Sequence, residues 1–156
     1  MNKINGISYS IYLVGSRSME PSFHTSDLLI VKKVDNLSTA QVNEFNNLKV
    51  GDAILFKNPA FFNKKGQLIN IVHRVIEIYK DSKGEKIIKT KGDANPVSIP
   101  KIDYPIFQKY YIGKVVYSIP YAGLFIKALS PPINYILITI AIIAIFISSF
   151  KKKKNN

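Results

Sequence analysis

The chain of 156 residues contains no cysteine and only two histidines. The absence of cysteine excludes a disulfide framework and a thiolate metal site, and two histidines do not predict a His-rich metal site. Acidic residues are also few, with 10 against 22 lysines and arginines, which gives a formal net charge of +12. The sequence therefore predicts a strongly basic chain with no metal and no cofactor, of a length typical of one domain.

A basic chain can bind nucleic acid or an anionic membrane surface, or it can simply carry a solvated charged face. The sequence shows no helix-turn-helix, no zinc finger and no aromatic RNA-binding signature. Apart from Lys151–Lys154, its basic residues are scattered along the chain. We therefore expect no nucleic-acid partner, favour the solvated face, and keep lipid headgroups as a second partner.

One long hydrophobic run, Ile133–Phe150, contains 18 residues without a charge. A helix of that length spans about 27 Å, close to the hydrocarbon thickness of a bilayer. Two prolines precede the run and four lysines follow it, which suits a transmembrane helix with a cytoplasmic C-terminus. The alternative is a buried core helix, although few soluble helices are apolar on every face. The N-terminal stretch Ile7–Gly15 is too short to span a membrane and is not typical of a secretory signal.

The remainder of the sequence is rich in short β-branched and aromatic runs bounded by turn residues, which is typical of strands. Many strands and few helices predict a mainly β fold, a compact barrel or coiled sheet. We expect this β domain over residues 1–130, a transmembrane helix over 131–150 and a basic cytoplasmic tail over 151–156. The segment Asn58–Gln67 is expected to be a polar loop. The expected strands are Ile7–Val14, Leu28–Val34, Ala53–Lys57, Leu68–Tyr79, Glu85–Thr90 and Tyr111–Ser118.

Three residues carry side chains suited to chemistry, and each also has an ordinary structural explanation. Ser18 lies where a strand meets the turn before Pro21, and most such serines are turn residues. His73 lies within an apolar strand, where a histidine is either a satisfied core residue or a general base. Asp93 lies in a turn after a strand, where it either ties that turn or orients an imidazole.

Four segments together resemble the motifs of signal peptidase I, in the order found in that family. They are Ser16–Pro21, Val50–Phe56, Ile71–Val75 and Lys91–Asn95. Any one of them is a weak signal, but the ordered set is a strong one. Histidine rather than lysine in the third motif is typical of the branch of S26 serine peptidases found in the endoplasmic reticulum, archaea and sporulating bacteria.

The resemblance implies a membrane-bound serine endopeptidase that removes signal peptides from exported preproteins outside the cytoplasm. It implies Ser18 as nucleophile and His73 as general base, with the Ser16 hydroxyl in the oxyanion hole. It also implies the bilayer, signal peptides and other membrane subunits as partners. Asp93 matches the aspartate of the last motif and is our preferred orienting carboxylate.

Two features depart from the family pattern. A further acid usually follows the last motif, yet here Pro96–Pro100 contains none and the next acid is Asp103. The orienting group is therefore Asp93, Asp103, or no acid at all. The family also commonly has a membrane helix just before the nucleophile strand, whereas this sequence begins almost at that strand.

Two other functions stay open at this point. A self-cleaving regulatory peptidase of the repressor type shares a similar β fold, but it predicts a lysine base, an Ala-Gly cleavage site and a DNA-binding arm, which the sequence lacks. A catalytically inactive, membrane-anchored binding or scaffold subunit would explain the missing acid. The presence of both Ser18 and His73 argues against that second function.

Overall fold

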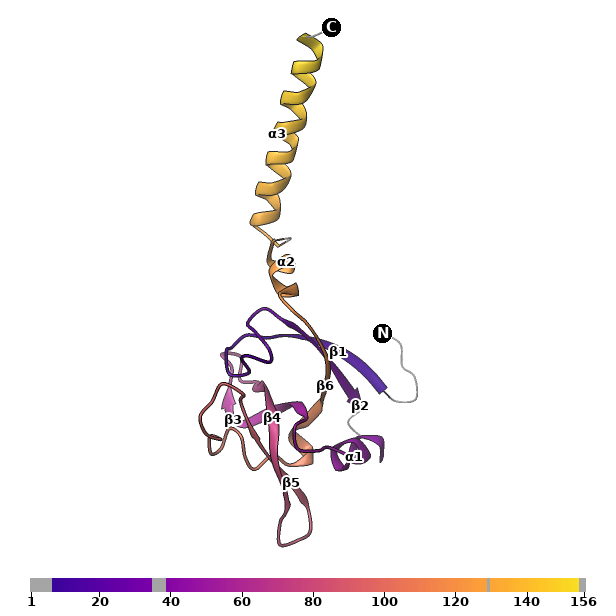
Figure 1. Ribbon diagram of the computed structural model, residues 1–156, viewed down its shortest axis with the longest axis vertical. Coiled ribbons are helices and arrows are strands. Elements are labelled where there is room, and N and C mark those ends of the chain that lie inside the picture. Colours follow the sequence, from indigo (N-terminus) through magenta and orange to yellow (C-terminus); the bar gives the residue numbers. More distant parts are fainter. Residues whose placement is uncertain (1–6, 35–38, 129, 155–156) are drawn as a thin grey trace.

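Six antiparallel strands form one coiled sheet, followed by two helices (Figure 1). A computed structural model describes residues 7–34, 39–128 and 130–154. Along the sheet the strands lie in the order β1-β2-β6-β3-β4-β5. The elements are β1 (Ile7–Leu13), β2 (Leu28–Val34), α1 (Thr39–Asn46), β3 (Ala53–Phe62), β4 (Leu68–Lys80), β5 (Lys86–Lys91), the short 3₁₀ helix η1 (Gln108–Tyr110), β6 (Tyr111–Ile119), α2 (Ala122–Ala128) and α3 (Ile133–Lys154).

The mainly β fold with a C-terminal apolar helix is thus confirmed, and all six expected strands are present. The main difference is at β3, which continues through part of the segment expected to be a loop. There the register shifts between Asn58 and Phe62, and pairing resumes at Phe62 opposite Leu68. The buried Asn58 side chain donates to the carbonyls of Lys101 and Ile102 at 3.2 Å. A polar side chain satisfied by a distant loop allows the strand to continue where its composition predicts a turn.

The centre of the domain is β3, because the sheet coils around it and buries both of its faces. Ile54 and Phe56 pack into one core cluster with Phe45 of α1 and Val75 of β4. The intervening Leu55 packs into a second cluster with residues of β2, such as Leu29 and Val31. Burial on both faces explains the unbroken apolar run at the start of β3, where alternation would be expected of a strand with one solvated face.

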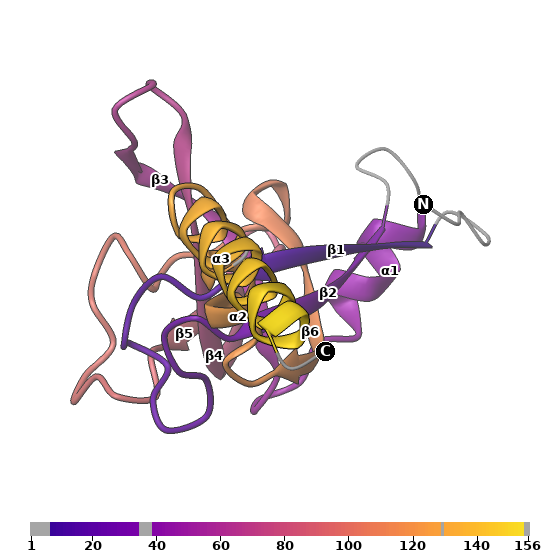
Figure 2. The same cartoon turned by 90° about the horizontal axis from the view of Figure 1, so that it is seen from above.

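The strands on either side of β3 form two walls. Seen from above, α1 lies beside β2 on one side of the domain, while β4 and β5 lie on the other (Figure 2). The end of β1 with the turn after it, and the first half of β4, face each other across the hollow between these walls. Ser18 and His73, which are 55 positions apart in the sequence, are brought together in this way.

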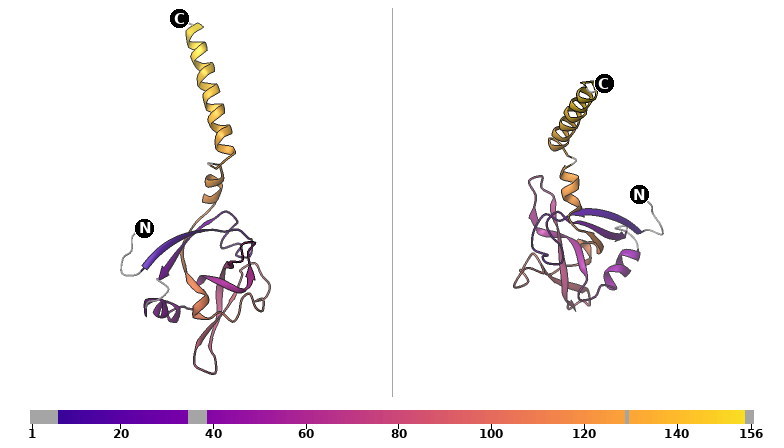
Figure 3. Two further views of the ribbon diagram at one scale, coloured as in Figure 1. Left: turned by 180° about the vertical axis from the view of Figure 1, so that it is seen from behind. Right: turned by 45° about the horizontal axis from the view of Figure 1, so that its top comes forward.

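The C-terminal helices leave the β domain along one direction. In both views of Figure 3, α3 projects away from the sheet, and none of its 18 residues from Ile133 to Phe150 is buried. By length and composition this segment is able to cross a membrane. A core helix would be covered by the domain, so the alternative of a buried core helix is not what the structure shows.

The helix α2 was not expected from the sequence. Its seven residues join the end of β6 to α3, and Leu124, Phe125 and Ile126 on it are exposed. Such a short apolar stretch gives no periodic signal that separates a helix from a strand end. Helix α3 begins at Ile133, the first residue of the apolar run, and continues through Lys154, into the segment expected to be a tail. Residues 155–156 of the expected basic tail, and residues 1–6 of the expected β domain, lie outside the described residues.

Candidate active site

Ser18 lies on a turn that is fixed to its surroundings at several points. The turn follows β1, and its neighbour Met19 is buried beneath it. The backbone N–H of Phe23 donates to the carbonyl of Met19 at 2.9 Å, and that of Ala94 donates to the carbonyl of Ser18 at 3.0 Å. Because the turn is held by its backbone, the Ser18 hydroxyl keeps a defined position at the end of the strand.

His73 lies within β4 and faces Ser18. Its Nε2 atom is 3.1 Å from the Ser18 Oγ, within the hydrogen-bond reach that a general base needs. His73 is only 4% exposed, and its ring lies edge-on against Phe56 at 6.4 Å between centroids. Packing against an aromatic side chain fixes the plane of the imidazole, so both ring nitrogens point at specific partners.

The other ring nitrogen of His73, Nδ1, contacts the carboxylate of Asp103. When Nδ1 carries the proton and donates it to that carboxylate, Nε2 is left as an acceptor for the Ser18 hydroxyl. This is the tautomer that a general base needs. The structure thus lines up a hydroxyl, an imidazole and a carboxylate in one row.

Asp103 is completely buried, and the protein satisfies both of its carboxylate oxygens. The Oδ1 atom also accepts from the Thr90 hydroxyl at 3.2 Å, and Oδ2 accepts from the backbone N–H of Ile99 at 2.7 Å. The backbone N–H of Thr90 further donates to the Asp103 carbonyl at 2.9 Å. A buried carboxylate without such partners would be costly, so these bonds explain how Asp103 can lie in the core.

Asp93, our preferred orienting group, does not face His73. Its carboxylate makes a two-pronged ion pair with Arg74, with Nη2–Oδ2 at 2.6 Å and Nε–Oδ1 at 2.8 Å. The reason is strand alternation, since Arg74 follows His73 along β4 and its side chain lies on the opposite face. The carboxylate contact that we assigned to Asp93 is therefore made by Asp103, and the assignment of Asp93 is corrected.

The same arginine ties three segments together. Arg74 also donates to the carbonyl of Gly51 at 2.8 Å and to the Ser22 hydroxyl at 3.0 Å. Partial burial favours the neutral acid, but hydrogen bonds from Arg74 and Ser22 outweigh it and hold the pKa of Asp93 below its ordinary value. The hydrogen bond that Arg74 donates to Asp93 likewise raises the pKa of Arg74. Through these bonds Arg74 connects the turn that carries Ser18, the turn before β3 and the turn after β5.

Ser16 lies beside the nucleophile, with its Oγ 3.3 Å from the Ser18 Oγ. Both serines border a hollow of about 380 Å³ between the end of β1 and the start of β4. Its other lining residues are mostly apolar, and they include Met19, Phe23, Leu29, Leu55, Ile69, Ile71 and Val72. The hollow can take small apolar groups directly against the Ser18 hydroxyl.

Comparison with known protein families agrees with this geometry. The family described as signal peptidase, peptidase S26, matches residues 4–89, more than half of the chain. The matched part includes Ser16, Ser18 and His73.

The chain belongs to the peptidase S26 family of signal peptidases. The signal peptidase complex catalytic subunit sec11 of Schizosaccharomyces pombe is 30% identical over 137 residues, which cover 82% of this chain and 72% of that protein. The catalytic subunit SEC11C of Rattus norvegicus is 27% identical over 147 residues, covering 88% and 67%. That of Homo sapiens is 29% identical over 129 residues, covering 78% and 57%. The resemblance to the His-type branch is thus confirmed, and the chain spans little more than half of the human relative.

Two residues of this S26 site were not identified from the sequence. Thr90 reads as an ordinary strand residue, and only the fold shows that its hydroxyl meets Asp103. Arg74 reads as the solvated neighbour of a histidine, and only the fold shows its link to Asp93. One indication of Asp103 was present in the sequence, because it is the first acid after the stretch where other members of the family carry a further acid beyond the last motif.

We expect Gly92→Ala to destabilise the site. A Cβ at Gly92 would lie 2.5 Å from the Ser18 carbonyl oxygen and 3.0 Å from His73 Nε2. Overpacking of this kind costs about 1–3 kcal/mol in the free energy of unfolding, measurable by urea denaturation. Gly15→Ala is the matched control, since a Cβ there meets nothing within 4 Å. Equal stability of the two variants would contradict the close approach at Gly92.

We expect Asp93→Asn to lower stability at pH 7 and much less at pH 3. A carboxylate whose pKa is lowered by folding contributes stability that is present above its unfolded pKa, near 4, and lost as the pH falls through its folded pKa. The difference in unfolding midpoint between wild type and variant should therefore shrink in acid. Glu77→Gln, at an exposed pair with Lys89, serves as control and should change little. A difference that is the same at both pH values would contradict the ion-pair role.

Proposed function

We propose that this chain is a serine endopeptidase that removes N-terminal signal peptides from exported preproteins. The observation that carries the proposal is the row formed by the Ser18 hydroxyl, the His73 ring and the buried Asp103 carboxylate. The family match and the names of the relatives, catalytic subunits of signal peptidase complexes, support it. The inactive-scaffold alternative depended on a missing acid, and Asp103 removes that argument.

The proposed reaction is acyl transfer to Ser18. His73 Nε2 takes the hydroxyl proton as the Ser18 oxygen attacks the scissile carbonyl, and Asp103 stabilises the imidazolium that forms. The imidazolium then gives its proton to the leaving amine as the C–N bond breaks. Water, activated by His73, hydrolyses the ester and frees Ser18.

The developing oxyanion needs donors close to Ser18. The backbone N–H of Ser18 and the Ser16 hydroxyl are the groups we assign to this role, by the family resemblance and by the position of Ser16. In the free protein the two serine hydroxyls lie within hydrogen-bonding distance of each other. Rotation of the Ser16 hydroxyl toward the carbonyl oxygen would redirect that donor when substrate binds.

The hollow beside Ser18 suits a substrate with small side chains before the cut. An extended peptide can pair with the end of β1 and the start of β4, as peptides commonly add to strand edges. The apolar lining then receives side chains from alternate positions of the substrate. No metal or cofactor enters the proposed reaction.

The proposed arrangement in the cell has a catalytic domain over residues 1–130, a membrane span over 131–150 and a cytoplasmic tail over 151–156. The exposed apolar surface of α3 supports the span, and the lysines that follow it support the cytoplasmic end. The catalytic domain then lies outside the cytoplasm, beside the bilayer and in reach of other membrane subunits.

Loss of any member of the row should abolish or strongly reduce cleavage of a preprotein with a small-x-small site. We expect Ser18→Ala and His73→Ala to be inactive, and Asp103→Asn to lose about 10⁴ in turnover because the imidazole takes the wrong tautomer. Asp93→Asn should keep most of its turnover at a temperature where it is folded. Thermal denaturation of each variant checks folding. Full activity of a folded Asp103→Asn variant would remove the carboxylate from the mechanism.

The membrane orientation can be tested with a tag placed after Asn156. In intact cells the tag should resist added protease, and it should be digested once the membrane is permeabilised. The reason is the clustering of Lys151–Lys154 directly after the span, which favours the cytoplasmic side by the positive-inside rule. Digestion in intact cells would reverse the proposed orientation.

A further inference from the structure

The last step of the proposed reaction needs a water molecule beside the acylated Ser18. That water must give a proton to His73 Nε2 while its oxygen attacks the acyl carbon. It must also approach from the side that the leaving amine has left, because the acyl chain occupies the other side. The site therefore needs polar groups next to Nε2, on the leaving-group side of Ser18.

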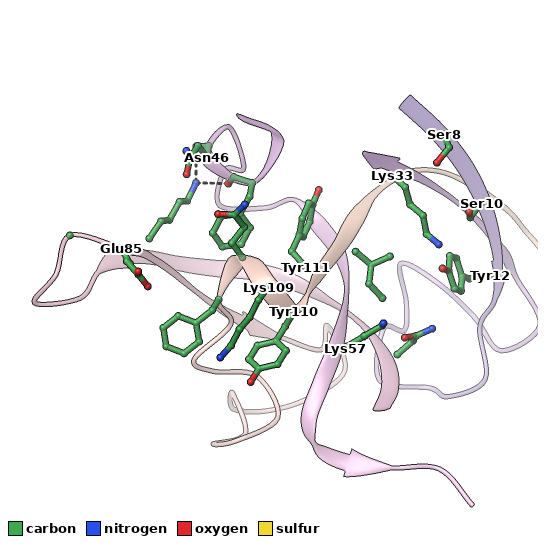
Figure 4. A pocket seen from close by; sticks show the side chains of 17 residues that line it. Ser8, Ser10, Tyr12, Lys33, Asn46, Lys57, Glu85, Lys109, Tyr110 and Tyr111 are labelled. Atoms are coloured by element: carbon green, nitrogen blue, oxygen red, sulfur yellow. Dashed lines mark hydrogen bonds between the residues drawn. The ribbon is translucent and has the colours of Figure 1, made fainter. Parts of the chain in front are cut away.

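Two cavities near the site lie on the acyl side. In the proposed reaction the acyl part of the substrate fills the hollow beside Ser18. A larger cavity of about 1080 Å³ lies between β1 and the segment around η1, and it shares Tyr12 and Asn70 with that hollow (Figure 4). Ser18 and His73 are not among the described residues that line it. The acyl chain thus separates solvent in the larger cavity from Ser18, and the attacking water has to come from another side.

The turn after β5 lies against Ser18 outside these cavities. The backbone N–H of Ala94 donates to the Ser18 carbonyl at 3.0 Å, and that of Asn95 donates to the Gly92 carbonyl at 3.0 Å. Lys91 Nζ donates to the Asn95 carbonyl at 2.7 Å. No residue of this turn is among the described residues that line either cavity. The backbone of Asn95 is therefore held beside the nucleophile, away from the acyl side.

Gly92 brings three polar atoms together next to the imidazole. A Cβ there would lie 2.5 Å from the Ser18 carbonyl oxygen, 2.8 Å from Asn95 Nδ2 and 3.0 Å from His73 Nε2. Asn95 Nδ2 is therefore no farther from Nε2 than the sum of 2.8 and 3.0 Å. A single water that makes one ordinary hydrogen bond to each of two atoms bridges a separation of up to about 6 Å. One water can thus contact both nitrogens.

The side-chain amide of Asn95 is available to hold such a water. Within the described part of the chain, the hydrogen bonds of Asn95 are made by its backbone alone, and the residue is half-buried. Its donor atom Nδ2 lies near two acceptors, the Ser18 carbonyl oxygen and Nε2 of His73 in the tautomer of a base. One donor and two acceptors match one lone pair and two hydrogens of a water. The second lone pair is then left for attack on the acyl carbon.

We propose that Asn95 positions the water that hydrolyses the acyl-enzyme. The inference rests on the proposed function, which supplies the ester on Ser18. The water accepts from Asn95 Nδ2 and donates to the Ser18 carbonyl and to His73 Nε2. As its oxygen bonds to the acyl carbon, Nε2 takes one of its protons. The ester C–O bond then breaks, and the imidazolium returns that proton to the Ser18 oxygen, which leaves free serine and the carboxylic acid of the acyl chain.

A peptide ester separates acylation from hydrolysis. The probe is a small-x-small peptide whose last residue is esterified to p-nitrophenol. With the full chain in detergent micelles, the wild type should release about one equivalent of nitrophenol in a burst before steady turnover. In Asn95→Ala we expect the same burst but a kcat about tenfold lower, the effect of one lost hydrogen bond. KM should fall by the same factor, so that kcat/KM, which reports acylation, stays unchanged.

Acyl-enzyme accumulation and rescue give two further measurements. The acylated protein should accumulate in Asn95→Ala, measured as added mass after acid quench. Hydroxylamine, which attacks the ester without a positioned water, should raise turnover more in this variant than in the wild type. Asn95→Leu, similar in size but without a donor, should behave in the same way. Asn47→Ala removes an amide from an exposed residue after α1 and should match the wild type. Thermal denaturation checks the folding of each variant.

The outcomes separate this proposal from the proposed function. A folded Asn95→Ala variant with wild-type burst and wild-type kcat would overturn the inference alone. An equal loss of burst rate and kcat would make Asn95 part of the scaffold, which also overturns it. So would a fall in kcat/KM for a peptide with residues after the cut, with the ester unaffected, because Asn95 would then bind the leaving chain. Release of nitrophenol by Ser18→Ala at the wild-type rate would instead remove the nucleophile, and with it the proposed function itself.

Discussion

The contact between the His73 ring and the Asp103 carboxylate lies in the core, and the geometry of the site depends on it. A carboxylate with no solvent exposure is stable only if its oxygens are paired, and here the imidazole, the Thr90 hydroxyl and the Ile99 N–H share that task. The loop that carries Asp103 must therefore fold back over β5. In doing so it fixes which nitrogen of His73 is left to face Ser18.

The coiled sheet makes this contact possible. Because β3 is buried on both faces, the strands beside it wrap around it, and the end of β1 comes to face the start of β4. Ser18, on the turn after β1, then meets His73, which pairs with Ile54 within β4. The space that remains between these two walls forms the hollow at Ser18.

The two aspartates near His73 have different roles because successive side chains of β4 point to opposite faces of the strand. Asp93 lies with Arg74 on one face of β4, where the ion pair ties the nucleophile turn to the turn after β5. Asp103 approaches the other face, where it contacts the imidazole. The two carboxylates thereby avoid sharing one site, where like charges would raise the pKa of one of them. The arrangement lets one acid stabilise the scaffold while the other orients a ring.

The sequence by itself determined the local features: six strands, an apolar helix after Pro132, and Ser18 and His73 in motifs whose order indicates the family. Alternation and length are local properties, so they can be read from neighbouring residues. The choice between Asp93 and Asp103 was not local, because it depends on how the loop after β5 folds back over the sheet. The same holds for Thr90 and for the extension of β3 past Asn58. Only tertiary structure decided these, since each depends on contacts between residues far apart in the chain.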